Sequence, residues 1–528
     1  MFLSALLLGA ALVPGPGPGP GPRPSSAHAP RTALVLLLTV DQFRPDYLER
    51  YNDQWTGGLR RLYDESVVFR DGRQDHAITE TAPGHSTLLS GRRPARTGIL
   101  TNLKGVPDSS APLLEVPGPG ASPRRFIGST LADWMRARDS ATRVLSVSRK
   151  DRGAIAPIGR ALGGVYWYEA GKFTTSRYYA DTLPHWVREF NDRHGPERLA
   201  GTTWSLLLPE SAYAEPDSEP YENDGRDFTF PHSLPGAPAA LTQVMKNYPW
   251  MDSLTLDLAL DGVAATGLGR RDSPDLLSVS LSTTDAIGHN FGPDSRELHD
   301  QLLRLDHWLG WFLDSLAVLV PREQTIIVLT SDHGVQSFVE HTREEGRPAA
   351  RIWFGALARR TEGMLEDRYH QRFFLDFDYG ILSGDTVAMH ALGIPVDSLA
   401  GALAGQMRRA EGVKRVFTPR SLAAAPAGDR EARLWRNQIP GRHAWLAAGV
   451  LQPGFTWQGT AGWTNHATTN ELDIRVPILF WRAGLRHAVI DRAVPTVDIG
   501  PTLAALLDLT PTEPVEGRPL PEVVRPRP

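Results

Sequence analysis

The sequence of 528 residues predicts an α/β fold with a mainly parallel central sheet flanked by helices. Two observations support this prediction. Five short apolar runs are spread along the chain, and continuous apolar runs are typical of strands buried on both faces of a parallel sheet. Segments with helical spacing of apolar residues lie between them, and strands that alternate with helices form parallel sheets.

The predicted strands are taken in chain order. They cover residues 33–40, 144–147, 276–281, 325–330 and 478–481. The clearest predicted helix lies before the fourth strand, where apolar residues recur at alternating intervals of four and three. These residues are Leu298, Leu302, Leu305, Leu309, Phe312 and Leu316. Their spacing places them on one helix face, which is expected to pack on the sheet.

The beginning of the chain has the pattern of an export signal. Residues 2–13 are apolar but too few to span a bilayer, and small residues follow around Ala27-His28-Ala29. We therefore expect residues 1–29 to be a signal peptide and the protein to be periplasmic or secreted. No later stretch is long and apolar enough to predict stable membrane insertion. Residues 30–528 are expected to form one domain, with insertions at about 160–250 and 340–460 that cap a site.

Composition narrows the class of function. The net charge is −4, which gives no indication of a nucleic-acid scaffold as partner. The chain has no cysteine, which excludes thiol nucleophiles, iron–sulfur clusters and thiolate zinc sites. Any metal site must therefore use histidine and oxygen ligands.

Acidic residues and histidines follow three of the predicted strands. Asp41 ends the first, Asp285 follows the third with His289 four residues later, and the pair Asp332-His333 follows the fourth. Ligands of open α/β sheets bind beyond the carboxyl ends of the strands, so we expect these side chains to meet there. Imidazole and carboxylate groups suit a pair of zinc ions.

Two zinc ions need about six protein ligands, and the strand ends supply five. A sixth ligand, a histidine after the second insertion, is required. Position alone does not choose among the candidates, which are His341, His370, His390, His443, His466 and His487.

Two further segments indicate phosphoryl chemistry. Residues 78–86 lead into a predicted helix, and a hydroxyl there would lie near the helix N-terminus, where anions are favoured. Thr79, Thr81, Ser86 and Thr87 are equivalent candidates for a nucleophile on composition alone. After the second strand, an extended segment would place Lys150 and Arg152 on one side, where they could bind a phosphoryl dianion.

The order of these motifs resembles the alkaline phosphatase superfamily. It is nearest to the phosphate-irrepressible (PafA-type) alkaline phosphatases and then to the nucleotide pyrophosphatase/phosphodiesterases. The resemblance extends from about residue 33 to 520. Its motifs are Val40-Asp41-Gln42, Thr81-Ala82-Pro83-Gly84-His85, Ser148-Arg149-Lys150-Asp151-Arg152-Gly153, Asp285-Ala286-Ile287-Gly288-His289, Ser331-Asp332-His333-Gly334 and Thr464-Asn465-His466.

This resemblance implies a role for each site residue. Thr81 would be the nucleophile, and Asn102 would donate to a phosphoryl oxygen. Lys150 and Arg152 match a pair found in the monoesterases and lacking in the diesterases. One zinc ion would be held by Asp285, His289 and His466, and the other by Asp41, Asp332 and His333 with the Thr81 oxygen alongside.

The leading functional prediction is zinc-dependent hydrolysis of small-molecule phosphate monoesters through a phosphothreonine. The first alternative is a type I phosphodiesterase or nucleotide pyrophosphatase with the same two-metal site, in which aromatic residues of the 160–250 insertion stack a nucleobase. A sulfatase is disfavoured by the lack of cysteine, and a phosphoglycerate mutase by the export signal. The alternative outside enzymes is a metal-binding pseudoenzyme.

Overall fold

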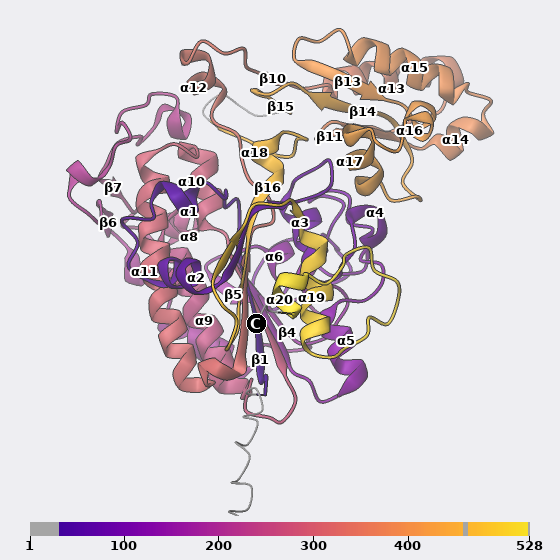
Figure 1. The fold of residues 1–528 in the computed structure, drawn as a ribbon. Helices are drawn as coiled ribbons and strands as arrows, with labels where there is room; N and C mark the ends of the chain where they lie inside the picture. The colour runs from indigo at the N-terminus through magenta and orange to yellow at the C-terminus, as the bar shows by residue number, and fades with distance from the viewer. Residues whose placement is uncertain (1–30, 458–462, 526–528) are drawn as a thin grey trace, which may run out of the picture.

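The computed structural model describes residues 31–457 and 463–525, and a large twisted sheet runs through its centre (Figure 1). The predicted signal peptide at 1–29 lies outside the described residues. In the described part, ten strands form this sheet in the order β17-β2-β16-β9-β1-β8-β3-β4-β5, with β18 paired to β2. Their bounds are β1 Leu34–Val40, β2 Val67–Arg73, β3 Val144–Ser148, β4 Gly164–Glu169, β5 Lys172–Thr174, β8 Asp275–Leu281, β9 Thr325–Thr330, β16 Arg475–Trp481, β17 Ala488–Ile490 and β18 Val494–Pro495.

The centre of the sheet confirms the predicted α/β class. Strands β9, β1, β8, β3 and β4 are parallel neighbours, and four of them are the first four apolar runs of the sequence. The fifth run became β16, which is antiparallel to β9. The expectation of a parallel strand was wrong there. The chain enters β16 from the loop around His466, at the edge where the parallel strands end, so it must run back across the sheet.

Helices cover both faces of the sheet because successive side chains of the strands point in opposite directions. Leu34, Leu36 and Leu38 of β1 face one core, and Val35 and Leu37 face the other. The first core is covered by α1 Tyr47–Arg50, α2 Gly58–Glu65, α7 His185–Arg193, α8 Pro238–Val244, α9 Trp250–Thr266, α10 Thr283–Phe291 and α11 Arg296–Leu319. The second is covered by α3 Thr81–Leu88, α5 Leu131–Arg138, α6 Asp151–Ile155, α19 Ile499–Leu506 and α20 Pro521–Val524. The apolar spacing from Leu298 to Leu316 is confirmed as α11.

The segment predicted as an insertion at 340–460 forms a second sheet with its own core. It is drawn in orange beyond the end of the central sheet in Figure 1. Its antiparallel strand order is β11-β12-β14-β13, and a short parallel pair, β10 with β15, lies beside it. The bounds are β10 Ala350–Ile352, α13 Gly355–Tyr369, β11 Leu375–Asp378, β12 Ile381–Gly384, α14 Thr386–Ala391, α15 Val396–Met407, β13 Val413–Phe417, α16 Pro419–Ala424, α17 Arg430–Gln438, β14 Trp445–Leu451 and β15 Phe455–Trp457.

The segment at about 160–250 is arranged differently. It begins with β4 and β5, which extend the central sheet, and continues over the α9 and α11 side of the molecule. Its short strands β6 Thr203–Trp204 and β7 His232–Ser233 pair with each other. Among the described residues, the short helices α4 Pro94–Thr97, α12 Val339–Glu344 and α18 Glu471–Ile474 complete the α-helical elements.

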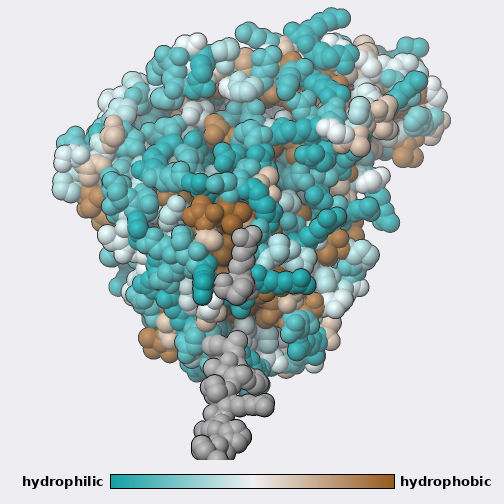
Figure 2. Space-filling model, viewed as in Figure 1, coloured by the Kyte–Doolittle hydropathy of each residue, from teal (hydrophilic) through white to brown (hydrophobic). Residues whose placement is uncertain are grey.

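The face of the molecule in Figure 2 is mostly hydrophilic, as expected for a chain in which 22% of the residues are charged. Apolar residues gather near the middle of this face. Within the described ranges, no helix has both the length and the apolar character needed to cross a bilayer.

Candidate active site

The candidate site lies where the parallel strands β1, β8 and β9 end together. Val40 pairs with Leu281, and Thr39 pairs with Thr330, so the three strands reach one edge in register. Asp41 follows β1, Asp332 follows β9, and Asp285 lies in the first turn of α10 after β8. The topology therefore gathers carboxylates that are far apart in sequence.

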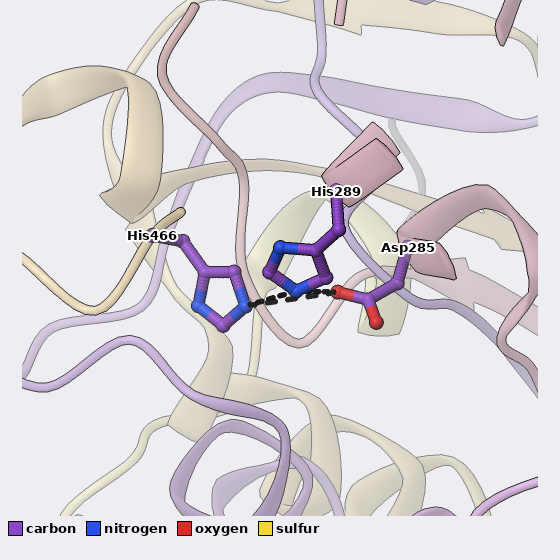
Figure 3. Close-up of side chains that lie close together, drawn as sticks. All are labelled: Asp285, His289 and His466. Atoms are coloured by element: carbon purple, nitrogen blue, oxygen red, sulfur yellow. Dashed lines mark hydrogen bonds and ion pairs between the residues drawn. The ribbon is translucent and has the colours of Figure 1, made fainter. Parts of the chain in front are cut away.

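Asp285, His289 and His466 form the first acid–histidine group (Figure 3). The His289 Nε2 lies 3.2 Å from Asp285 Oδ1 and 3.2 Å from His466 Nε2. The other ring nitrogens face backbone carbonyls: His289 Nδ1 is 2.8 Å from the oxygen of Thr464, and His466 Nδ1 is 2.7 Å from that of Thr79. A carbonyl that binds one ring nitrogen turns the other toward a metal.

Asp41, Asp332 and His333 form the second group, and all three are fully buried. In the part of the chain that the structure describes, Asp41 Oδ1, Asp332 Oδ2 and His333 Nε2 make no hydrogen bond. Asp332 Oδ2 lies 3.1 Å from His85 Nδ1, and Asp41 Oδ1 lies 3.4 Å from His333 Nε2. Buried polar atoms without hydrogen bonds are costly, and three of them so close together fit a bound cation. Oxygen and imidazole donors without sulfur are compatible with zinc.

The remaining candidate histidines, His341, His370, His390, His443 and His487, belong to neither group. His443, for example, faces the hydroxyl of Ser383 at 2.8 Å in the second sheet. Among the described residues, His466 is the candidate histidine that joins an acid–histidine group, and its role as the sixth metal ligand stays a prediction.

The Lys150 ammonium lies between the two groups. Its Nζ is 2.5 Å from Asp41 Oδ2, 2.6 Å from Asp285 Oδ2 and 3.1 Å from Thr81 Oγ1. Burial raises the pKa of Asp41, and the neighbouring carboxylates of Asp285 and Asp332 add to that effect. Burial also opposes ionisation of Asp285, but Lys150 and His289 hold its pKa well below the ordinary value. This concentration of negative charge favours cations.

Thr81 is the first residue of α3 and is buried. Its carbonyl lies 2.9 Å from the Nδ1 of His85, one turn later, and the same nitrogen is 3.1 Å from Asp332 Oδ2. The next residue, Ala82, donates its N–H to Asn102 Oδ1 at 2.8 Å. The side chain of Asn102 is thereby fixed beside the start of α3. This bond uses its carbonyl oxygen and leaves its amide nitrogen to donate elsewhere.

Lys150 and Arg152 reach the same cavity, but not from an extended segment. Lys150 is the N-cap of α6, and Arg152 lies in the first turn of that helix. The expected extended conformation was wrong because the chain turns into a helix directly after β3. Lys150 keeps extended backbone angles, whereas Arg152 is helical, and both side chains line the cavity.

The cavity above these groups has a volume of about 490 Å³. Its wall combines the site residues with three aromatic side chains, Trp353, Tyr379 and Trp463. Trp353 and Tyr379 come from the second insertion. Nucleobase stacking by the 160–250 insertion belonged to the diesterase alternative, and the cavity does not support it. Its described lining includes no residue of 160–250, and Tyr166, Trp167 and Tyr168 are buried in β4.

Sequence reasoning assigned no role to several residues that shape the site. Gln42 donates its side-chain amide to Asp285 Oδ1 at 3.0 Å and its N–H to Asp332 Oδ1 at 3.2 Å. Glu80 accepts the N–H of Asn102 at 3.0 Å, and its burial raises its pKa to about 8. Gln42 adjoins Asp41, and His85 lies one helical turn from Thr81, so both could have been found from spacing; Glu80 gave no such signal.

A mainly parallel sheet with two acid–histidine groups and a buried threonine at its carboxyl edge defines an α/β protein with a candidate two-metal site. Comparisons with known proteins identify the family. A family model described as type I phosphodiesterase / nucleotide pyrophosphatase matches residues 35–346, and the chain belongs to this family. It is 28% identical to alkaline phosphatase PafA of Elizabethkingia meningoseptica, over 94% of this chain and 95% of PafA. It is 31% identical to alkaline phosphatase PhoK of Sphingomonas sp, over 92% of this chain and 90% of PhoK.

The fold comparison agrees with the sequence comparison. A crystal structure of wild-type PafA superposes with a TM-score of 0.85 at 26% identity and covers 94% of this chain and 99% of PafA. These findings confirm the resemblance seen in the motifs. The chain is an alkaline phosphatase-like hydrolase of the PafA type.

Proposed function

We propose that this protein is a zinc-dependent alkaline phosphatase that hydrolyses small-molecule phosphate monoesters through a phosphothreonine. The observation that carries the proposal is that Lys150 and Arg152 share one cavity with Thr81 and the first acid–histidine group. The Lys150 ammonium also contacts the second group, at 2.5 Å from Asp41 Oδ2. The relatives named alkaline phosphatases, which match nearly the whole chain, support it. Export through residues 1–29 remains a prediction, which N-terminal sequencing of the mature protein would test.

The donor sets fit two zinc ions. Asp285, His289 and His466 would hold one, and Asp41, Asp332 and His333 would hold the other, with the Thr81 oxygen alongside. When bound, zinc lowers the pKa of a neighbouring hydroxyl or water and neutralises charge that develops on phosphoryl oxygens.

The chain's own residues then have the following roles. The Thr81 oxygen, having lost its proton, bonds to phosphorus as the bond from phosphorus to the leaving oxygen breaks, and the released alcohol takes a proton from solvent. Water next attacks the phosphothreonine, which releases inorganic phosphate and restores Thr81. Asn102, Lys150 and Arg152 hold the non-bridging oxygens and stabilise their charge in the transition state.

Charge favours a monoester over a diester. A monoester dianion brings two negative charges, and two cationic side chains can bind its oxygens. A diester has one negative charge and carries a second organic group, which these side chains would crowd. The Arg152 guanidinium is only loosely engaged by its own chain, with a 3.5 Å contact to Asp151.

The test is kinetics on a monoester and a diester with the same leaving group, using zinc-loaded protein. We expect a clear preference for the monoester. The Lys150→Ala variant should lose most of that preference, and Thr81→Ala should lose activity on both substrates. A diesterase preference that Lys150→Ala leaves intact would instead assign a type I phosphodiesterase. Metal analysis that finds no zinc, together with an inactive wild type, would assign a pseudoenzyme.

A further inference from the structure

Two tryptophans on the cavity wall differ from most of the large aromatic residues of the protein. Trp353 and Trp463 have 49% and 41% of their surface exposed, although both line the cavity that contains Thr81. By contrast, Trp134, Trp204 and Trp435 are fully buried. A large apolar ring that is bare at the mouth of a polar cavity contributes little to core packing, and such rings are enriched at binding sites.

Trp353 is held in place by the helix that follows it, α13. It lies between β10 and α13, and a Cβ placed on Gly355 would come within 2.1 Å of its ring. The ring therefore packs directly over a glycine that leaves room for it. The Arg359 guanidinium lies 4.9 Å from the ring centroid, within cation–π range. A ring fixed in this way loses little side-chain entropy when a ligand packs against it.

Trp463 is held beside the first acid–histidine group. Its ring centroid is 5.6 Å from that of His289, with the ring planes tilted by 31°. Its carbonyl accepts a hydrogen bond from Arg351 Nη2 at 2.9 Å. Arg351 belongs to β10, two residues before Trp353, so one strand connects the positions of both tryptophans.

The position of Trp463 indicates which part of a substrate it meets. The attacking and leaving oxygens lie on opposite sides of phosphorus in an in-line displacement. Thr81 and Asp332 are linked through His85, so the attacking side belongs to the second acid–histidine group. The leaving group then lies toward Asp285, His289 and His466, where Trp463 is.

We propose that Trp353 and Trp463 form a subsite for leaving groups that carry a planar aromatic ring, so that the protein favours aromatic over aliphatic phosphate monoesters. This inference rests on the proposed function. Stacking on an indole depends on a flat π face, which a saturated ring of the same size lacks. The ring can belong to a small aryl alcohol or to a nucleoside.

Two matched substrate pairs test the proposal in zinc-loaded protein. Benzyl phosphate and cyclohexylmethyl phosphate differ in aromaticity and little in size or leaving-group basicity. Adenosine 5′-monophosphate and ribose 5-phosphate share an ester carbon and differ by the base. We expect Trp353→Ala and Trp463→Ala each to lower kcat/KM about tenfold for the aromatic member of a pair and less than about twofold for its partner.

Two control variants separate stacking from general damage. Trp353→Phe keeps an aromatic face and should retain most of the preference. Trp311→Ala removes a tryptophan that is also 49% exposed but lies on α11, outside the cavity, and should change neither pair. An effect in the benzyl pair alone assigns small aryl groups, and an effect in the nucleotide pair assigns nucleosides. Equal losses for aromatic and aliphatic substrates, or no loss in either pair, would overturn the proposal.

A binding measurement distinguishes failure of this inference from failure of the proposed function. Benzylphosphonate and cyclohexylmethylphosphonate are not hydrolysed, so calorimetry gives their Kd values whatever the reaction is. Tighter binding of benzylphosphonate that Trp353→Ala abolishes would support the subsite even if the protein proved to be a diesterase. Normal monoesterase activity with equal Kd values for the two phosphonates would overturn the subsite and leave the function intact.

Discussion

The burial of His76 makes the folded protein less stable in acid. The side chain is fully buried, which lowers its pKa to about 3, and the charge of Arg93 adds to the shift. The unfolded chain takes up a proton at this residue near pH 6.5, whereas the folded chain does so only near pH 3. The unfolded state is therefore favoured progressively as the pH falls between these values.

We predict that replacing His76 reduces this loss of stability in acid. His76→Phe removes the proton-linked contribution, which is about 2 kcal/mol between pH 6.5 and 5. Urea unfolding at the two pH values should show a smaller decrease for the variant than for the wild type. His390→Phe, at an exposed position, serves as the control. Equal decreases for the wild type and His76→Phe would contradict the prediction.

Asp473 links the loops that carry two of the histidines in the site. It is fully buried, and burial raises its pKa to about 7. Its Oδ2 accepts the Thr468 hydroxyl at 2.6 Å and the Thr468 N–H at 3.1 Å, two residues from His466. Its carbonyl accepts the N–H of Gly334, next to His333, at 2.8 Å. Residues of this kind orient metal ligands without touching the metal.

We predict that Asp473→Ala weakens zinc binding by about ten- to a hundredfold, because Thr468 loses its acceptor. Asp473→Asn keeps a side-chain oxygen for Thr468 and should lose much less. Competition with a chelator of known affinity measures both, independently of activity. The same zinc affinity in Asp473→Ala and the wild type would show that the loop holds His466 without this carboxylate.

At the scale of elements, α3 and the end of β9 approach each other too closely for a side chain at Gly84. A Cβ there would lie 2.1 Å from the backbone oxygen of Asp332. This contact sets the distance between the helix that begins with Thr81 and the strand that ends before Asp332. The glycine of the Thr81-Ala82-Pro83-Gly84-His85 motif is thus explained by close packing.

We predict that Gly84→Ala lowers both stability and activity. The helix must move away from β9, at a cost of about 1–3 kcal/mol, and Thr81 moves with it. Gly363→Ala is the matched control: it lies in α13, is exposed, and has no atom within 4 Å of the added Cβ. That variant should gain about 0.5–1 kcal/mol from helix propensity and keep its activity. Thermal unfolding and kinetics on both variants check this, and a fully active Gly84→Ala would contradict the packing argument.

The elements also show what the sequence could and could not predict. Apolar runs identified β1, β3, β8 and β9 because they are buried on both faces. An apolar run does not show in which direction its strand crosses the sheet. The strand β16 was therefore predicted at the right residues, but its antiparallel direction was not. Strand β2 has three apolar residues followed by Arg70 and Asp71, which is too short a run to stand out.

Some residues of the candidate site could likewise be predicted from the sequence, and others could not. Acids that follow apolar runs were predictable because parallel strands end at one edge. His466 was not, because 177 residues separate it from His289 and the insertion between them has its own core. Trp353 and Tyr379 reach the cavity only through the tertiary placement of that insertion, which no local pattern encodes.

In the whole molecule, five of the six proposed metal donors follow strands β1, β8 and β9 of the central sheet, and the sixth, His466, follows the inserted unit. Three carboxylates and three histidines thus meet only when distant segments have folded together. Lys150 offsets part of the buried negative charge by its ion pairs with Asp41 and Asp285. The chain can therefore fold around these acids before metal binds, and metal should add stability to a structure that already exists.

We predict that zinc stabilises the folded protein without being required for folding. A ligand present at a thousand times its Kd adds about 4 kcal/mol to the stability of the state that binds it. Protein stripped with a chelator should keep the far-ultraviolet circular dichroism of a folded α/β protein, unfold at a lower temperature, and recover its higher midpoint as zinc is added. His466→Ala should show a smaller recovery, because it removes one of the three donors of the first acid–histidine group. A midpoint that zinc does not change would contradict the metal assignment, and loss of all secondary structure on chelation would contradict the role given to Lys150.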